Sequence, residues 1–119
     1  MIQEIAFTAY AVTDMARSRA FYEGVLGLKP SAQFNPTNSP NWIEYDLGQG
    51  TFAIGCSPEW PPSEVGAAIA FEVADFDAII TALKKASVPF KGEPGSYPTC
   101  SMAVILDPDK NKVLIHKRK

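Results

Sequence analysis

Two segments of this chain begin in the same way, about half a chain apart. One apolar run ends at Val12 and is followed by Asp14, and a second ends at Val73 and is followed by Asp75. The two valines are separated by 61 positions (73 − 12). An aspartate directly after a strand can cap a following helix. The repetition predicts two copies of one unit, each a strand, a helix and three further strands.

The first copy is predicted over about residues 1–56. Its first strand spans residues 5–12, and its helix runs from the Asp14 cap to about Leu26. Gly27 stands where a helix commonly closes with a residue in the left-handed conformation. Three strands should follow, with Gly48-Gln49-Gly50 joining the last two, at residues 29–34, 42–47 and 51–56.

The second copy is predicted over about residues 66–119, after a proline-rich connection at residues 57–65. A strand at residues 68–73 leads to the Asp75 cap. The helix after it presents one apolar face, formed by Phe76, Ile79, Ile80 and Leu83. Three strands should close the chain, at residues 89–93, 102–106 and 112–116. We therefore expect one α+β domain covering residues 1–119, built from two βαβββ modules.

Composition excludes several classes of function. The chain has 119 residues with a formal net charge of -2, so it carries no basic footprint for nucleic acid. Its amino terminus lacks the features of a signal peptide, and no apolar run reaches membrane-spanning length. Cys56 and Cys100 are isolated, without CxxC spacing. They are interpreted as reduced thiols, and the expected location is cytoplasmic.

The segments VTDMARSRAFYEGVLGL and DPDKNKVLIH identify a family resemblance. With the order of elements around them, they resemble the vicinal oxygen chelate superfamily, which includes glyoxalase I, extradiol dioxygenases, fosfomycin-resistance enzymes and bleomycin-resistance proteins. The resemblance covers essentially the whole chain. It implies that the eight strands form a cupped mixed sheet around a cavity. One departure is Lys110, where the family usually has glycine; Asn111 is expected to tolerate the left-handed conformation in this turn.

The resemblance also implies where metal ligands would stand. Metal-dependent members place one ligand on the first strand and one on the last strand of each module. The matching residues cannot coordinate a cation, and they are Phe7, Ala53, Ala68 and Leu114. The chain contains one histidine in all, His116, so a single subunit cannot form a site that needs two. A site with two histidines could form only across a dimer axis, from two copies of His116. We therefore expect no metal and no other cofactor.

Strand alternation predicts which side chains face the cup. The helix-facing positions carry the bulkier residues, including Ile43, Tyr45, Leu47, Ile69 and Phe71. The cup-facing positions carry alanines with a few aromatic and charged groups: Phe7, Ala9, Ala11, Trp42, Glu44, Asp46, Ala68, Ala70, Glu72, Lys112, Leu114 and His116. Apolar walls with a few polar groups are typical of a small-molecule pocket.

The candidate substrate-binding residues are Phe7, Trp42, Glu44, Ala53, Ala68, Glu72, Leu114 and His116. Glu44, Glu72 and His116 are candidate hydrogen-bonding or acid–base groups, since a carboxylate in an apolar cup is expected to have its pKa raised. The alternative is that Phe7 and Leu114 fill the vacated space as ordinary core, with both carboxylates at a wet rim.

Three functions remain open from the sequence. The favoured one is a metal-free protein, similar to bleomycin-resistance proteins, that sequesters a small, partly apolar or aromatic compound. The second is an enzyme of glyoxalase or dioxygenase type with a divalent metal and atypical ligands. The third is a non-catalytic interaction protein in which the Trp60 segment contacts a partner. A homodimer is expected, with Trp60 as the apolar surface that a second copy covers.

Overall fold

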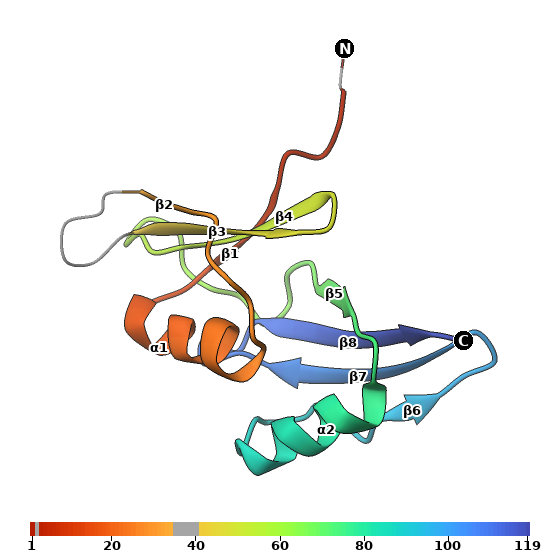
Figure 1. The fold of residues 1–119 in the computed structure, drawn as a ribbon. Coiled ribbons are helices and arrows are strands. Elements are labelled where there is room, and N and C mark those ends of the chain that lie inside the picture. Colours follow the sequence, from red (N-terminus) through yellow and green to blue (C-terminus); the bar gives the residue numbers. More distant parts are fainter. Residues whose placement is uncertain (2, 35–40) are drawn as a thin grey trace. The chain divides into compact units, whose positions relative to one another are not determined.

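The computed structural model describes residues 1, 3–34 and 41–119. The chain divides into two compact units, Met1–Pro62 and Ser63–Lys119. Each unit contains one four-stranded mixed sheet and a helical segment, so the predicted α+β class is confirmed (Figure 1). Within the described residues, no helix is long and apolar enough to cross a membrane.

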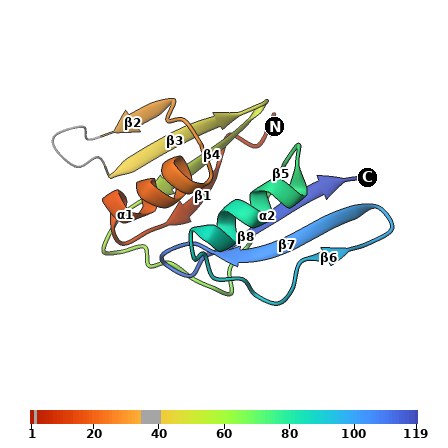
Figure 2. The same ribbon diagram turned by 60° about the horizontal axis from the view of Figure 1, so that its bottom comes forward.

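The first unit has the strand order β1-β4-β3-β2. Its middle strands β3 and β4 form an antiparallel hairpin, and β1 pairs with β4 in parallel. A parallel pair needs a crossover connection, which here begins with the helix (Figure 2). The strands of this unit are β1 (Thr8–Ala11), β2 (Ala32–Phe34), β3 (Trp42–Leu47) and β4 (Gly50–Gly55).

The helical segment of the first unit changes its geometry half-way. The Asp14 carboxylate accepts the Arg17 backbone N–H at 3.0 Å and caps α1 (Met15–Arg19) as predicted. The segment then continues as a π-helix, η1 (Ala20–Val25), which the sequence did not predict. Two aromatic residues adjacent in sequence, Phe21 and Tyr22, are both buried in this wider turn. Gly27 closes the segment with φ +76°, in the left-handed conformation expected of it.

The core of the first unit lies between this helix and one face of the sheet. The predicted alternation holds along β3, where Ile43 and Tyr45 are buried, but Leu47 is exposed. The predicted core position of Leu47 is therefore wrong. Leu47 is the last residue of β3 before the hairpin turn, at the edge of the buried face. The largest buried side chains of this layer are Tyr22, Ile43, Tyr45, Phe52 and Ile54.

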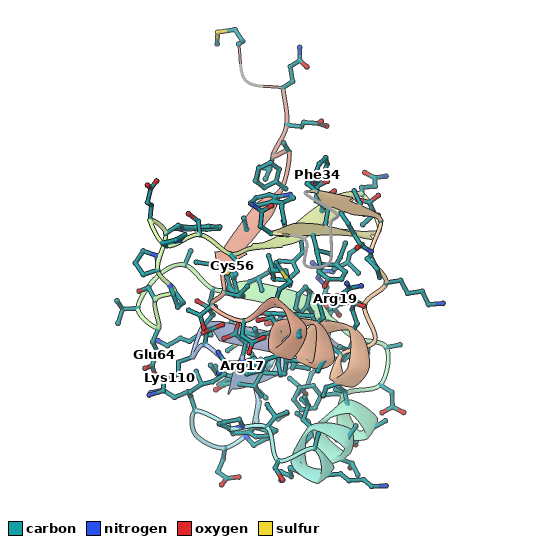
Figure 3. All side chains as sticks on the ribbon, turned by 90° about the vertical axis from the view of Figure 1, so that its left-hand side faces the viewer. Arg17, Arg19, Phe34, Cys56, Glu64 and Lys110 are labelled. Carbon is teal, nitrogen blue, oxygen red and sulfur yellow. The ribbon has the colours of Figure 1, made fainter. Side chains whose placement is uncertain are left out.

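A polar cluster fixes the helix on the sheet. Glu23 accepts from Arg19 Nε at 2.8 Å and from the Tyr45 hydroxyl at 2.9 Å. Arg19 lies on the sheet side of the helix (Figure 3). Burial, reinforced by the hydrogen bond to Glu23, raises the pKa of the Tyr45 phenol well above its ordinary value. The Tyr45 phenol is therefore protonated at physiological pH, and its hydroxyl donates to the Glu23 carboxylate.

The second unit repeats this plan with the strand order β5-β8-β7-β6. Asp75 accepts the Ala78 N–H at 3.0 Å and caps α2 (Phe76–Lys85), which lies across one face of the sheet (Figure 2). Ile80 and Leu83 of this helix are buried with Val113 and Ile115. The strands are β5 (Ile69–Glu72), β6 (Gly95–Ser96), β7 (Cys100–Leu106) and β8 (Lys112–Arg118).

The strand predicted at residues 89–93 is wrong. The chain there runs beside β7 only briefly, with one isolated bridge between Phe90 and Ile105. Gly92 then takes φ +80°, which turns the backbone away. Pairing with β7 resumes at Gly95–Ser96. The predicted strand is thus interrupted by one left-handed glycine.

The turn between β7 and β8 is held by two buried polar residues. The Asp107 carboxylate accepts the backbone N–H of Asn111 at 2.8 Å and its side-chain amide at 2.8 Å. The left-handed residue is Lys110, with φ +68°, and not Asn111 as expected. Asn111 contributes its side chain to the turn, and the residue before it, Lys110, adopts the left-handed backbone conformation.

We expect Lys110→Gly to stabilise the protein by about 0.5–1 kcal/mol, because a side chain in the left-handed region costs about 1 kcal/mol or more. Urea unfolding followed by circular dichroism measures this change. Gly27→Ala is the reciprocal control: a Cβ there meets nothing within 4 Å, so its destabilisation reports the backbone conformation alone. A Lys110→Gly variant that is less stable than the wild type contradicts this account.

Candidate functional site

The predicted site residues fall into two groups, one in each unit. Four belong to the first unit, on the sheet face opposite α1. Register places Glu44 beside Ala53, and Ala53 beside Ala9, in one row across three strands. Trp42 occupies the next row, and Phe7 precedes β1 by one residue. The predicted alternation is therefore correct for this face.

The Trp42 indole is held from several sides. The Phe7 ring meets it edge to face, with centroids 5.2 Å apart and planes at 77°. The Trp60 ring stacks on it at 6.4 Å and 27°. The indole Nε1 donates a hydrogen bond of 2.9 Å to the Glu44 carboxylate. Phe7, Trp42 and Glu44, three predicted site residues, are thus brought together.

Gly55 provides the space that the two indoles occupy. A Cβ atom at Gly55 would lie 2.8 Å from Trp42 Cε3 and 2.8 Å from Trp60 Cζ3, closer than real contacts allow. Gly55 is the cross-strand partner of Trp42. The sequence interpretation missed Gly55, and it assigned Trp60 to a partner contact. Counting the hairpin register back from Gly48-Gln49 would have placed Gly55 opposite Trp42.

These rings form part of an exposed aromatic patch, which we define as Phe7, Phe34, Trp42 and Trp60. Phe34 is the cross-strand partner of Trp42 on the other side and lies on the sheet face away from the helix (Figure 3). Phe7 is 46% exposed, Phe34 51% and Trp60 38%. Large aromatic side chains normally avoid such exposure, and contiguous ones indicate a binding surface.

The second group of predicted residues lies in the second unit. Glu72 pairs with His116 in register, and Leu114 pairs with Ala70 in the row before, all on the sheet face opposite α2. Ala68 lies one residue before β5 begins and is exposed. The structure therefore joins Glu72, His116 and Leu114 on one face and leaves Ala68 outside the strand.

Glu72 is hydrogen-bonded through both of its carboxylate oxygens. Its Oε1 lies 2.6 Å from His116 Nδ1, and its Oε2 accepts the Arg118 backbone N–H at 2.7 Å. The hydrogen bond from Arg118, followed by that from His116, lowers the pKa of Glu72 below its ordinary value. The expectation that this pKa is raised is therefore wrong: the side chain is exposed, and its hydrogen bonds favour the charged form.

The four positions that the family resemblance matches to metal ligands carry side chains without donor atoms: Phe7, Ala53, Ala68 and Leu114. Across residues 1, 3–34 and 41–119, no three or more histidine, cysteine, aspartate or glutamate side chains are grouped to hold a metal ion. These four side chains cannot bind a divalent metal.

Several solved structures have the same fold as this chain. A glyoxalase family protein from Bacillus anthracis superimposes with a TM-score of 0.81 at 20% identity, covering 100% of this chain and 98% of that one. TnmS3, an antibiotic-binding protein from Streptomyces sp. CB03234, gives 0.78 at 20% identity, covering 99% and 98%. The fosfomycin-resistance protein FosX from Mesorhizobium loti gives 0.71 at 19% identity, covering 100% and 95%. At these identities the likeness concerns the fold.

Comparison with models of protein families assigns the sequence to a family. No similar sequence is found among curated proteins. The profile of the Glyoxalase/Bleomycin resistance protein/Dioxygenase superfamily matches residues 4–115, which is nearly the whole chain. Together with the paired modules and their capped helices, this match shows that the chain belongs to the Glyoxalase/Bleomycin resistance protein/Dioxygenase superfamily.

Proposed function

We propose that this protein binds a small, partly apolar organic molecule at the aromatic patch of its first unit. The observation that carries the proposal is the environment of Trp42, whose ring is fixed by Phe7, Trp60 and the hydrogen bond to Glu44. An aromatic surface that is already ordered loses little conformational entropy when a ligand binds. Such a preformed surface suits a planar or aromatic compound.

The chemistry around the patch supports a ligand with one polar group. Glu44 is half-buried beside the indole and supplies a carboxylate acceptor at the edge of an otherwise apolar surface. In the adjacent row Ala9 is half-buried, and Ala53 beside it is fully buried. Apolar area provides the affinity of such sites, and a few polar groups fix the orientation of the ligand.

The comparisons agree with a binding role. One structural neighbour is an antibiotic-binding protein, and another is a fosfomycin-resistance protein. Fold alone does not transfer a function. We nevertheless propose that the present chain binds ligands of the same general class, small organic compounds. The alternative of a glyoxalase-type or dioxygenase-type enzyme with a divalent metal is disfavoured, because Phe7, Ala53, Ala68 and Leu114 cannot be ligands.

A homodimer in the cytoplasm forms part of the same proposal. Trp60 stacks on Trp42 with one face and is still 38% exposed, so it offers apolar surface to a second copy. Both cysteines are free thiols, which persist in a reducing compartment.

Trp42→Ala should weaken ligand binding by a few-fold to a hundredfold, on the order of 1–3 kcal/mol for one buried aromatic contact. Titration calorimetry with the planar dyes acridine orange and 8-anilinonaphthalene-1-sulfonate measures this. Tyr97→Ala is the matched control, since Tyr97 is an exposed aromatic residue of the second unit. Equal affinity in the wild type and in Trp42→Ala would exclude the patch as the site.

Gly55→Ala tests the arrangement of the rings without removing any of them. The added methyl would displace Trp42 and Trp60, so dye affinity should fall while both indoles remain. These are the only two tryptophans of the chain, so intrinsic fluorescence reports on the patch alone and its emission maximum should shift. An unchanged spectrum together with unchanged affinity contradicts the packing described here.

Elemental analysis separates the binding protein from the metal-dependent enzyme. Protein purified without an affinity tag should contain zinc, nickel, manganese and iron far below one atom per chain, and a chelator should leave dye binding unchanged. Stoichiometric amounts of one of these metals, with activity lost on chelation, would establish the enzyme instead.

The dimer is tested by light scattering over a range of concentrations. A particle of about twice 12.9 kDa is expected, and Trp60→Ser should shift it toward the monomer. A 12.9 kDa particle at every concentration refutes the dimer.

A further inference from the structure

Three side chains with soft or borderline metal-ligand atoms share one face of the second unit's sheet. Cys100 and Met102 alternate along β7 and therefore point to the same side. Met102 is paired in register with His116 of the neighbouring strand β8. A thiol, a thioether and an imidazole thus stand on one face, in two adjacent rows.

The ladder brings Met102 and His116 close together. The Lys119 backbone N–H donates to the Thr99 carbonyl at 3.1 Å, which makes these two residues a hydrogen-bonded pair. Hydrogen-bonded and non-hydrogen-bonded pairs alternate along an antiparallel ladder, and Met102–His116 lies three steps further along. It is therefore a non-hydrogen-bonded pair, the kind in which Cα atoms are about 4.5 Å apart and side chains are closer. Cys100 is the diagonal neighbour of His116 on the same face of the sheet.

Glu72 orients the imidazole toward this group. The strand order β5-β8-β7 places His116 between Glu72 on one side and Met102 on the other. His116 Nδ1 lies 2.6 Å from the Glu72 carboxylate. A carboxylate at neutral pH can only accept a hydrogen bond, so we assign the proton of the neutral imidazole to Nδ1. The other ring nitrogen, Nε2, then carries no proton and can serve as a ligand. Metal-binding histidines commonly have one nitrogen held by a carboxylate while the other binds the ion.

We propose that Cys100, Met102 and His116 form a binding site for a soft monovalent metal ion, Cu(I) in particular. Thiolate and thioether ligands select Cu(I), and imidazole is compatible with it. The site differs from the hard divalent centre considered above in its residues and in its donor atoms. It is also independent of the aromatic patch, which lies in the other unit.

The surroundings suit such an ion. All three side chains are half-buried, so the ion can enter and is still partly shielded. Gly95 continues the row beyond Met102, and the Tyr97 ring covers it, with its hydroxyl 2.7 Å from where a Cβ would stand. Arg118 lies opposite Cys100, and its charge is offset by Glu72, 4.0 Å away. A bound Cu(I) and the Cys100 thiolate neutralise each other.

The test is titration of the reduced, untagged protein with Cu(I) under anaerobic conditions, in competition with the chromophoric chelator bathocuproine disulfonate. One Cu(I) per chain is expected. Cys100→Ser and His116→Gln should each lower the affinity by at least about tenfold, and Met102→Leu by less. Cys56→Ser is the matched control, because Cys56 is the other free thiol and belongs to the first unit. It should bind Cu(I) like the wild type.

X-ray absorption of the loaded protein identifies the donors directly. A mixed coordination shell of sulfur and nitrogen is expected, and Cys100→Ser should lose one sulfur. Circular dichroism of each variant confirms its fold before titration, so a lower affinity cannot be ascribed to unfolding. Equal losses in Cys56→Ser and Cys100→Ser, a shell of sulfur alone, or no competition with the chelator would each overturn the proposal.

Discussion

The parallel pairing between the first and the last strand of each repeated unit determines most of this structure. A parallel pair cannot be closed by a tight turn, so each unit requires a helix that crosses one face of its sheet. That helix buries the face with the bulky side chains, such as Tyr45 and Ile115. The other face is left to small, aromatic and polar residues. The strand connection therefore leaves one face of each sheet uncovered by the helix of its own unit.

The sequence predicted this division well because it depends on short-range patterns. The aspartate caps, the left-handed Gly27 and the period-2 alternation along β3 follow from local stereochemistry. Each could be derived without knowing which strands pair. The family resemblance then supplied the topology, and the match over residues 4–115 confirms the family.

What could not be predicted depends on neighbours that are distant in sequence. The π-helical turn accompanies the burial of Phe21 and Tyr22 in the core of the first unit. The lowered pKa of Glu72 depends on a hydrogen bond from Arg118, 46 residues away. Trp60 lies in a proline-rich connection that carries no strand or helix pattern, so nothing local indicated that it stacks on Trp42. Contacts between residues that are distant in sequence could therefore not be read from local patterns.

Every strand pairing among the named strands joins two strands of the same half of the chain. The boundary between the two units falls between Pro62 and Ser63, within the proline-rich connection. A cut through the backbone there would separate two fragments, and each fragment would keep all of these strand partners. Each half of the chain can thus be prepared as a separate fragment that carries one of the two surfaces described above.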